Sequence, residues 1–497
     1  MKRSLDRQNI VRDVSFFSGG TYISQVMFCI RGFLNAKILG PSLYGLWSAL
    51  NIILSYASYV QLGSVNAMNR EIPYQSGRSL SGDMRKTRNA TFTICLFMNL
   101  VFSLTLIIIG CLLWNKVSLN ESLGFIAIGI LAVISSMHEY YKTLLIAIKS
   151  FFLISKANVI FSAFSIVLTL ILVPMLNIYG VYIAAIIIPL SSLLYIWSRK
   201  PYKLRLNFDL KEISRLVGIG FPLMSIDFLE SVITSIAGMM VLFFLGKANM
   251  GYYAVAMLAG RFLMYFPNSI NRTFEPHIYQ RYGETHRISE LKKYIFKPAV
   301  VMSLIFPVVI VFYYTAVSFF IRHFLGKYNE AIYPFFIILI ARFFASFSPT
   351  APIFITAINK QRFLIPVYLT GIAIVAAAGS ILINMGFGVS AVAVALLLTF
   401  FFVSSVIFVY TEGHYMKSKI KCLSHMFCLY IPLIYMIIAL FVTETIILSA
   451  KDIIADVWRL VMKFGILFIF SAPLLYIADR KTAILSDLFS FFKKEKT

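Results

Sequence analysis

The sequence has few charged residues and very few acidic ones. Charged residues make up 13% of the 497 residues, about half the share of an ordinary soluble domain, whereas 59% are hydrophobic. Only 21 Asp and Glu stand against 45 Lys and Arg, and the mean hydropathy is +0.83. This composition excludes a soluble multi-domain enzyme, a disordered chain and a fibrous chain. The length allows a dozen or more membrane spans of about 20 residues each.

Several motifs of other protein classes are also missing. No G-x4-G-K-[ST] or kinase-like pattern is present, so we expect no built-in ATPase. The five cysteines, an odd number set mostly in apolar runs, argue against a disulfide framework. Cys422 and Cys428 flank His425 in CLSHMFC, but this spacing is unlike the usual zinc motifs, and we expect no metal site. Residues 1–13 and the long apolar run after them do not resemble a cleavable signal peptide.

Long apolar runs predict an all-α polytopic membrane protein with fourteen spans. The runs are 14–38, 43–67, 90–114, 122–141, 156–176, 181–198, 216–245, 251–271, 298–319, 332–356, 363–384, 388–411, 426–447 and 458–477. Alternate connections carry 34 Lys and Arg residues on one side and seven on the other. Since basic loops stay in the cytoplasm, both termini are predicted to be cytoplasmic. Topology thus accounts for the positive charge, and we expect membrane lipids rather than nucleic acid as its partner.

The connections predicted to lie outside are short, at most about a dozen residues. They leave no room for the outer domain of a membrane-bound glycosyltransferase or polymerase. We therefore expect a protein that is not an enzyme.

The two halves of the chain resemble each other at a nearly constant offset. LGPSLYG at 39–45 matches LGKANMG at 245–251, TLLIAIK at 143–149 matches IFITAIN at 353–359, and NIYGVYIAA at 177–185 matches MGFGVSAVA at 385–393. Each half contains six spans, an even number, so the repeat is parallel, as in two-lobed secondary transporters. We expect a cleft between two six-helix lobes that opens to either side by rocking.

This repeat predicts the domain organisation. We expect a cytoplasmic N-terminus (1–13), an N-lobe of spans 1–6 (14–198), a basic cytoplasmic linker (199–215), a C-lobe of spans 7–12 (216–411), an appended C-terminal helix pair of spans 13–14 (412–477) and a cytoplasmic tail (478–497).

Ionisable side chains within the predicted spans are the candidate functional residues, because each costs about 2.5–3.5 kcal/mol at mid-membrane. They are Arg31, Glu139, Asp227, Glu230, Arg261 and Arg342. Guanidinium groups suit phosphate oxygens, so the three arginines predict a cationic substrate-binding cleft. Asp227 is expected about 15 Å deep and shares a helix face with Glu230. These two acids and Glu139 are candidates for coupling transport to an ion.

Structural interpretations of the same residues stay open. Asp227 and Arg261, on neighbouring spans, are candidates for an ion pair between helices. Glu139 is a candidate headgroup-level carboxylate beside His138. Arg31, with Lys37, is a candidate for snorkelling to the outer interface.

At this point the residues resemble a known family. LGPSLYGLWSALNIILSYASYVQLG with the basic loop after it, and GFPLMSIDFLESV with FLGKANMGYYAVAMLAGRFLMYF in the second half, look like the polysaccharide flippases. The resemblance covers most of residues 14–411. It implies the multidrug/oligosaccharidyl-lipid/polysaccharide (MOP) exporter superfamily and, within it, the Wzx-type O-antigen and polysaccharide flippases.

The resemblance implies a flippase of the plasma membrane (the bacterial inner membrane). Such a protein moves undecaprenyl-diphosphate-linked oligosaccharide, an O-antigen or other surface polysaccharide unit, from the inner to the outer leaflet, coupled to an H⁺ or Na⁺ gradient. It needs no other cofactor, and its expected partners are the lipid-linked substrate, a polysaccharide polymerase and the chain-length machinery of lipopolysaccharide assembly. The family often places cleft arginines at the positions of Arg31 and Arg261.

The sequence departs from the family at one acidic position. Many members carry an Asp followed by a basic residue late in the seventh span, where this chain reads TSIAGMMV with Ala237 and Gly238. A role for that acid therefore does not carry over. The alternative function is a multidrug exporter of the same superfamily working by Na⁺ or H⁺ antiport. A non-transporting scaffold for glycan synthesis is a third hypothesis, against which the repeat and the mid-membrane charges argue.

Overall fold

The computed structural model describes residues 2–77, 81–148, 150–199, 204–416, 418–448 and 452–482. These residues form helices and no strands, and twelve of the helices are long and apolar enough to cross a membrane. The predicted all-α polytopic fold is therefore confirmed. Two of the twelve, Gly19–Val60 and Leu210–Leu263, each hold two predicted spans, which meet at Gly40 and Gly246. Most of the expected tail, 478–497, lies outside the described residues.

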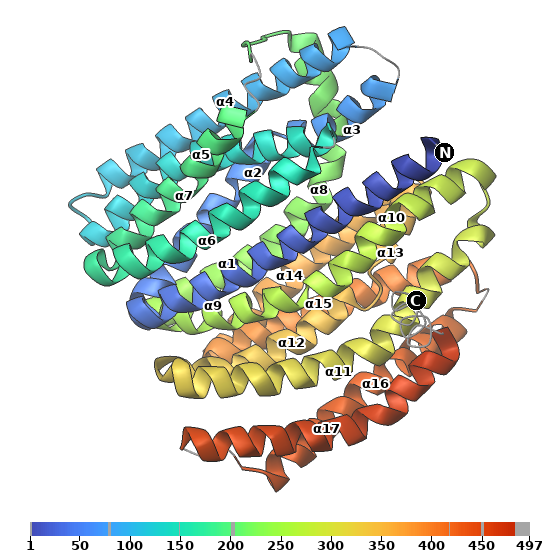
Figure 1. The fold of residues 1–497 in the computed structure, drawn as a ribbon. Helices are drawn as coiled ribbons and strands as arrows, with labels where there is room; N and C mark the ends of the chain where they lie inside the picture. The colour runs from blue at the N-terminus through green and yellow to red at the C-terminus, as the bar shows by residue number, and fades with distance from the viewer. Residues whose placement is uncertain are drawn as a thin grey trace. The chain divides into compact units, whose positions relative to one another are not determined.

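The chain divides into two compact units, Met1–Ala254 and Val255–Thr497, so the division falls after the expected linker 199–215 (Figure 1). The helices that begin in the first unit are α1 (Lys2–Ser55), α2 (Ala57–Val60), α3 (Ser64–Gly77), α4 (Ser81–Leu112), α5 (Leu119–Ala147), α6 (Phe151–Leu176), α7 (Ile178–Arg199), α8 (Leu210–Met240), a π-helical turn (Val241–Leu245) and α9 (Gly246–Leu263).

The first unit has a core cluster near the helix ends that the charge pattern predicts to be cytoplasmic. Its core cluster joins α3, α4 and α5 through side chains such as Met68, Cys95 and Tyr140. The Tyr140 hydroxyl donates to the carbonyl of Arg88 at 3.0 Å, so the one polar atom of this buried ring is satisfied. In a bilayer every backbone polar group must be paired internally, which is why the apolar runs are helical.

The second unit contains the remaining helices. They are α10 (Tyr265–Thr285), a 3₁₀ turn (Ile288–Leu291), α11 (Lys292–Phe324), a 3₁₀ turn (Gly326–Ala331), α12 (Ile332–Ser346), α13 (Ala351–Ala357), a 3₁₀ turn (Gln361–Phe363), α14 (Leu364–Asn384), α15 (Gly388–Glu412), α16 (Lys419–Ile446) and α17 (Ile453–Thr482).

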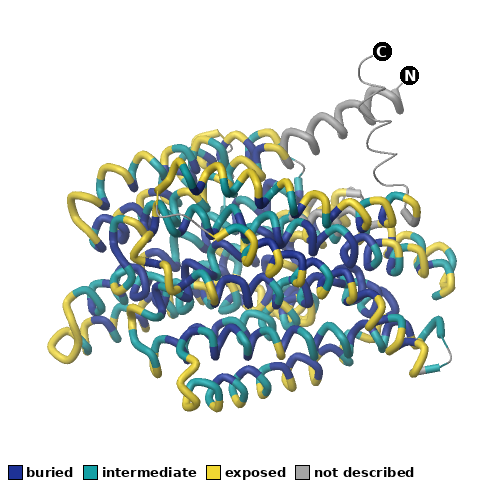
Figure 2. Tube along the Cα trace, turned by 90° about the horizontal axis from the view of Figure 1, so that it is seen from below, coloured by how far each residue is buried: buried dark blue, intermediate teal, exposed yellow. Residues whose placement is uncertain are grey.

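Helix α11 is central to the second unit. It packs against α12, α16 and α17 through a cluster that includes Val308, Met436 and Leu467. The appended pair α16 and α17 thus packs against the rest of the second unit through α11. Buried and exposed residues alternate along the helices (Figure 2), as expected where one side of a helix packs on protein and the other faces lipid.

Equivalent points of the two halves share the same backbone hydrogen bonds, as the repeat predicts. Helix α5 ends at Ala147 and α13 ends at Ala357. Beyond these ends, the amide of Ser150 donates to Leu145 at 2.8 Å, and the amide of Lys360 donates to Ile355 at 2.9 Å. The two donors are 210 residues apart, and so are the two acceptors, which is the offset that the sequence match gives. At this point the backbone therefore repeats as the sequence does.

Candidate functional site

Arg31 lies in α1, nine residues before the break at Gly40, and its side chain is half-buried. Its Nε atom is buried and has no hydrogen-bond partner among the described residues. A buried, unpaired donor on a charged group is costly, and this cost is removed when an anion or a water molecule fills the place. Lys37, which the sequence groups with Arg31, is exposed on the same helix.

Asp227 and Glu230 lie on α8, and their side chains differ in exposure. Asp227 is exposed and forms no ion pair with a described residue of its own unit, whereas Glu230 is half-buried. Two tyrosines hold this part of α8 in place. The Tyr59 hydroxyl donates to the backbone carbonyl of Asp227 at 3.3 Å, and the rings of Tyr56 and Tyr59 pack edge-on against Phe228. The backbone that carries Asp227 is thus fixed while its carboxylate stays accessible.

Glu139 already has a counter-ion. It pairs with Lys142 of the same helix at 3.1 Å, and both side chains are partly exposed. The neighbouring His138 is held by Ser192, 3.0 Å from Nε2, and stacks on Phe161. This geometry favours the structural interpretation for Glu139.

The two candidate arginines of the second unit, Arg261 and Arg342, are related through α9. Arg342 of α12 places its Nη2 atom 3.9 Å from the sulfur of Met257, and its guanidinium lies 5.9 Å from the ring centre of Phe400. Met257 and Arg261 are four residues apart, so they share a face of α9. The structure therefore brings Arg342 to the face of α9 that carries Arg261, whose side chain is exposed. Asp227 and Arg261 belong to different compact units, so their pairing stays a prediction.

Several ion pairs between helices were not anticipated from the sequence. Arg215 of α8 donates to Glu71 of α3 at 2.7 Å and to Glu212 at 2.8 Å, and Thr87 of α4 donates to Glu212 at 2.9 Å. This network joins the predicted cytoplasmic ends of three helices in the first unit. The spacing of Glu212 and Arg215, three residues apart on a helix, was the one local signal for it.

The appended helices carry further pairs of this kind. His323 contacts Asp456 at 2.8 Å, and Lys463 contacts Glu444 at 2.7 Å, joining α17 to α11 and to α16. Lys463 was recognisable as a charge inside an apolar run. Its partner was not, because the two residues lie on different helices.

His425, the centre of CLSHMFC, has a carboxylate partner. Its Nδ1 atom hydrogen-bonds Glu412, whose side chain is completely buried. Cys422 is buried and Cys428 is exposed. Across the described part of the chain, no group of three or more His, Cys, Asp or Glu side chains could hold a metal ion.

Known structures share this arrangement of helices. The lipid II flippase MurJ in an inward closed conformation superposes with a TM-score of 0.68 at 15% identity, covering 94% of this chain and 99% of that one. An inward-facing multidrug resistance MATE family transporter of the MOP superfamily gives 0.62 at 13% identity, covering 78% and 94%. A MOP superfamily transporter from Pyrococcus furiosus gives 0.51 at 13% identity, covering 81% and 95%. The fold is therefore that of the MOP superfamily.

The family model described as polysaccharide biosynthesis protein matches residues 34–333, more than half of the chain. The chain therefore belongs to the polysaccharide biosynthesis protein family. No curated protein sequence matches it. The family and the fold agree with the resemblance seen in the sequence.

Proposed function

We propose that this protein is a flippase that moves undecaprenyl-diphosphate-linked oligosaccharide from the inner to the outer leaflet of the plasma membrane by alternating access. The family match over residues 34–333 carries this proposal, because it assigns the chain to polysaccharide biosynthesis. The MOP fold supports it, since one of the similar structures is a lipid II flippase. The polymerase and chain-length machinery of surface polysaccharide assembly are the proposed downstream partners.

The chemistry of the substrate suits the arginines. A lipid diphosphate brings two or more negative charges into the membrane, and each charge-assisted hydrogen bond to it contributes about 1.5–3 kcal/mol. The buried Nε of Arg31 lacks an acceptor among the described residues. Arg342 contacts Met257, which lies one turn before Arg261, so its guanidinium lies at the face of α9 that carries Arg261. Arg261 is exposed and thus accessible to a ligand. These three groups are the proposed diphosphate-binding residues.

An ion gradient would drive the cycle only if the ion binds the two conformations with different affinity. Asp227 is the proposed coupling group, because its carboxylate is exposed on a fixed backbone. Glu230 lies one turn further on the same helix. H⁺ and Na⁺ are the two candidate ions.

The proposal is tested by reconstituting the full chain in proteoliposomes and measuring transfer of lipid-diphosphate-linked oligosaccharide between leaflets. Arg31→Ala and Arg261→Ala should each lower the rate about tenfold or more at unchanged protein content. Arg362→Ala, which removes an exposed arginine from the connection before α14, is the matched control and should keep the rate.

Wild-type rates in both alanine variants would overturn the substrate role of these arginines. Efflux of cationic drugs in place of lipid transfer would favour the multidrug exporter. Lys replacements distinguish a simple need for charge from a need for the guanidinium fork, because lysine keeps the charge and lacks the fork.

A further inference from the structure

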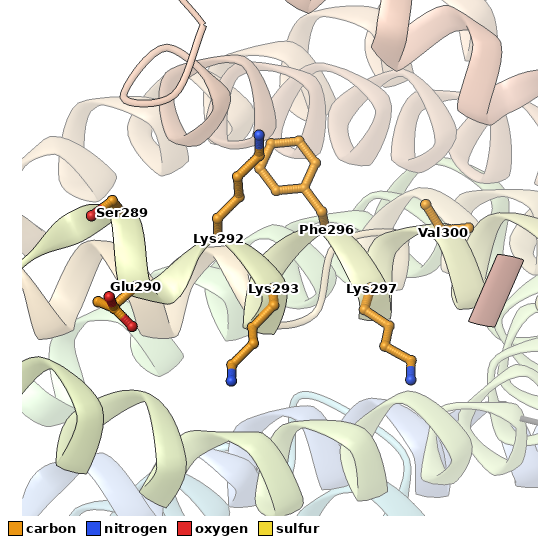
Figure 3. A pocket seen from close by; sticks show the side chains of 7 residues that line it. All are labelled: Ser289, Glu290, Lys292, Lys293, Phe296, Lys297 and Val300. Atoms are coloured by element: carbon orange, nitrogen blue, oxygen red, sulfur yellow. The ribbon is translucent and has the colours of Figure 1, made fainter. Parts of the chain in front are cut away.

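A basic pocket lies at the start of α11, apart from the arginines discussed above. It has a volume of about 670 Å³, within the range of about 300–1,000 Å³ typical of small-molecule sites. Its lining residues are Ser289, Glu290, Lys292, Lys293, Phe296, Lys297 and Val300. Lys293 and Lys297 extend side by side from one face of the helix, while Lys292 points the other way with Phe296 (Figure 3).

The three lysines of this pocket are exposed and give it a positive charge. Its one acid, Glu290, is engaged by Arg281, whose Nη2 atom lies 2.8 Å from the carboxylate. Lys292 lies over the ring of Phe296 at 5.7 Å and Lys293 over that of Tyr294 at 5.1 Å. Among the described residues, none of the three lysines forms an ion pair. The ammonium groups of Lys293 and Lys297, one turn apart, therefore extend on the same side of the helix without an ion-pair partner among the described residues.

The pocket is built on a fixed frame. The Tyr415 hydroxyl donates to the carbonyl of Ile288 at 3.0 Å, immediately before the lining residues. Phe296 packs between the rings of Tyr415 and His425, with ring centres 5.6 and 5.9 Å away. Further along α11, Ser303 donates to the carbonyl of Leu429 on α16. The lysines thus project from a helix end that is held in place by its contacts with Tyr415 and with α16.

We propose that this pocket binds the diphosphate headgroup of a lipid at the cytoplasmic face, before that lipid enters the transport pathway. The substrate class rests on the proposed function, and the location rests on the positive-inside pattern, since 272–297 is among the most basic connections. A diphosphate carries at least two negative charges and matches two neighbouring ammonium groups. A phosphodiester headgroup carries one charge and would leave one lysine unpaired.

Binding to the detergent-solubilised full chain tests this directly. Farnesyl diphosphate supplies the headgroup on a short lipid, farnesol supplies the tail alone, inorganic diphosphate supplies the headgroup alone, and phosphatidylglycerol supplies a phosphodiester. Lys293→Gln with Lys297→Gln should raise the Kd for farnesyl diphosphate about tenfold or more. It should leave phosphatidylglycerol and farnesol binding unchanged, and inorganic diphosphate should compete in the wild type only.

The matched control is Lys360→Gln with Lys421→Gln. It removes the same charge from two exposed lysines of the same unit, also on the predicted cytoplasmic side and outside the pocket. Its Kd for farnesyl diphosphate should equal that of the wild type. Lys293→Arg with Lys297→Arg keeps the charge and should retain most of the affinity. The midpoints of thermal unfolding, measured without ligand, should be the same for all variants, because the four substituted lysines are exposed.

Two results would overturn the inference. An unchanged Kd in the Lys293→Gln, Lys297→Gln variant would remove the pocket as a diphosphate site. An equal loss for phosphatidylglycerol, or for the control variant, would reduce it to a general anionic surface. Because binding is measured without transport, these outcomes are separate from a failure of the flippase proposal, which is judged by the Arg31→Ala and Arg261→Ala transfer rates.

Discussion

Gly40 and Gly246 adopt the same backbone conformation at equivalent points of the two repeats. Gly40 has φ 71° and ψ 174°, and Gly246 has φ 85° and ψ 177°. Residues other than glycine rarely adopt this region of backbone conformation. Each residue separates two membrane-spanning helices that continue in a new direction. The sequence match between 39–45 and 245–251 therefore reflects a backbone conformation that both repeats require at this glycine.

The matched segments also contact each other reciprocally. A Cβ atom on Gly45 would overlap the carbonyl of Lys247, and one on Gly251 would overlap the carbonyl of Pro41. Gly45 corresponds to Gly251 and Pro41 to Lys247 at the same offset of 206. Two related contacts thus join the repeats, and both need glycine because backbone atoms cannot move aside as a flexible side chain can.

Substitution of these glycines should destabilise the protein. We expect Gly45→Ala and Gly251→Ala each to lower the free energy of unfolding by about 1–3 kcal/mol, the usual cost of overpacking. Thermal unfolding of the purified protein measures this. Gly218→Ala on α8 is the control, because its Cβ would meet open space and alanine favours helix. Equal midpoints for Gly45→Ala and Gly218→Ala would contradict the contact.

Cysteine accessibility should report the predicted topology. In a background without the five native cysteines, Ser118→Cys and Ala248→Cys should react with a membrane-impermeant maleimide in intact cells. Asn207→Cys and Thr285→Cys should react only after permeabilisation. The expectation follows from the excess of Lys and Arg on one set of connections. Two or more sites on the opposite face would refute the orientation.

Asp227→Asn should uncouple transport from the ion gradient while keeping the fold. The exposed carboxylate makes no ion pair with a described residue of its own unit, so its loss should not alter abundance. We expect the gradient-driven rate to fall about tenfold, equivalent to about 1.4 kcal/mol in the barrier. Proteoliposomes with imposed H⁺ or Na⁺ gradients measure it.

Glu139→Gln is the control for this coupling, because Glu139 already pairs with Lys142. Its gradient dependence should match the wild type. Unchanged gradient-driven transport in both Asp227→Asn and Glu230→Gln would exclude coupling by these acids. If Asp227 instead pairs with Arg261, Asp227→Asn should lower abundance and the further change Arg261→Gln should restore it.

The Glu412–His425 pair should contribute strongly to stability. Glu412 is fully buried, and one of its carboxylate oxygens has no partner among the described residues, so removing the imidazole would leave a buried charge unpaired. We expect His425→Ala to cost about 3–5 kcal/mol of unfolding free energy. Replacing both residues by leucine should recover most of this loss. His277→Ala, at an exposed position of α10, is the control, and an equal effect of both alanine variants would contradict the role of the pair.

Local properties of the chain explain why so much was predictable. Hydropathy and charge along the sequence determine the membrane spans, because each span must satisfy its own backbone in lipid. The glycine-rich repeat was visible because a positive φ at Gly40 and Gly246 restricts the residue type directly. The fold and the family resemblance followed from these local features.

The partners that charged groups have on other helices were decided by the tertiary structure alone. Glu71 and Arg215 lie 144 residues apart and meet because α3 packs on α8, and Glu412 meets His425 because α15 and α16 are neighbours. Nothing local in the sequence encodes such pairs, since a carboxylate in an apolar run looks the same whether it faces a cation, a ligand or a cleft. The sequence by itself determined where charges enter the membrane. Helix packing decided which of them, like Glu412, have a partner on another helix and which, like Asp227, have no counter-ion among the described residues of their own unit, because pairing depends on what lies within a few ångströms in space.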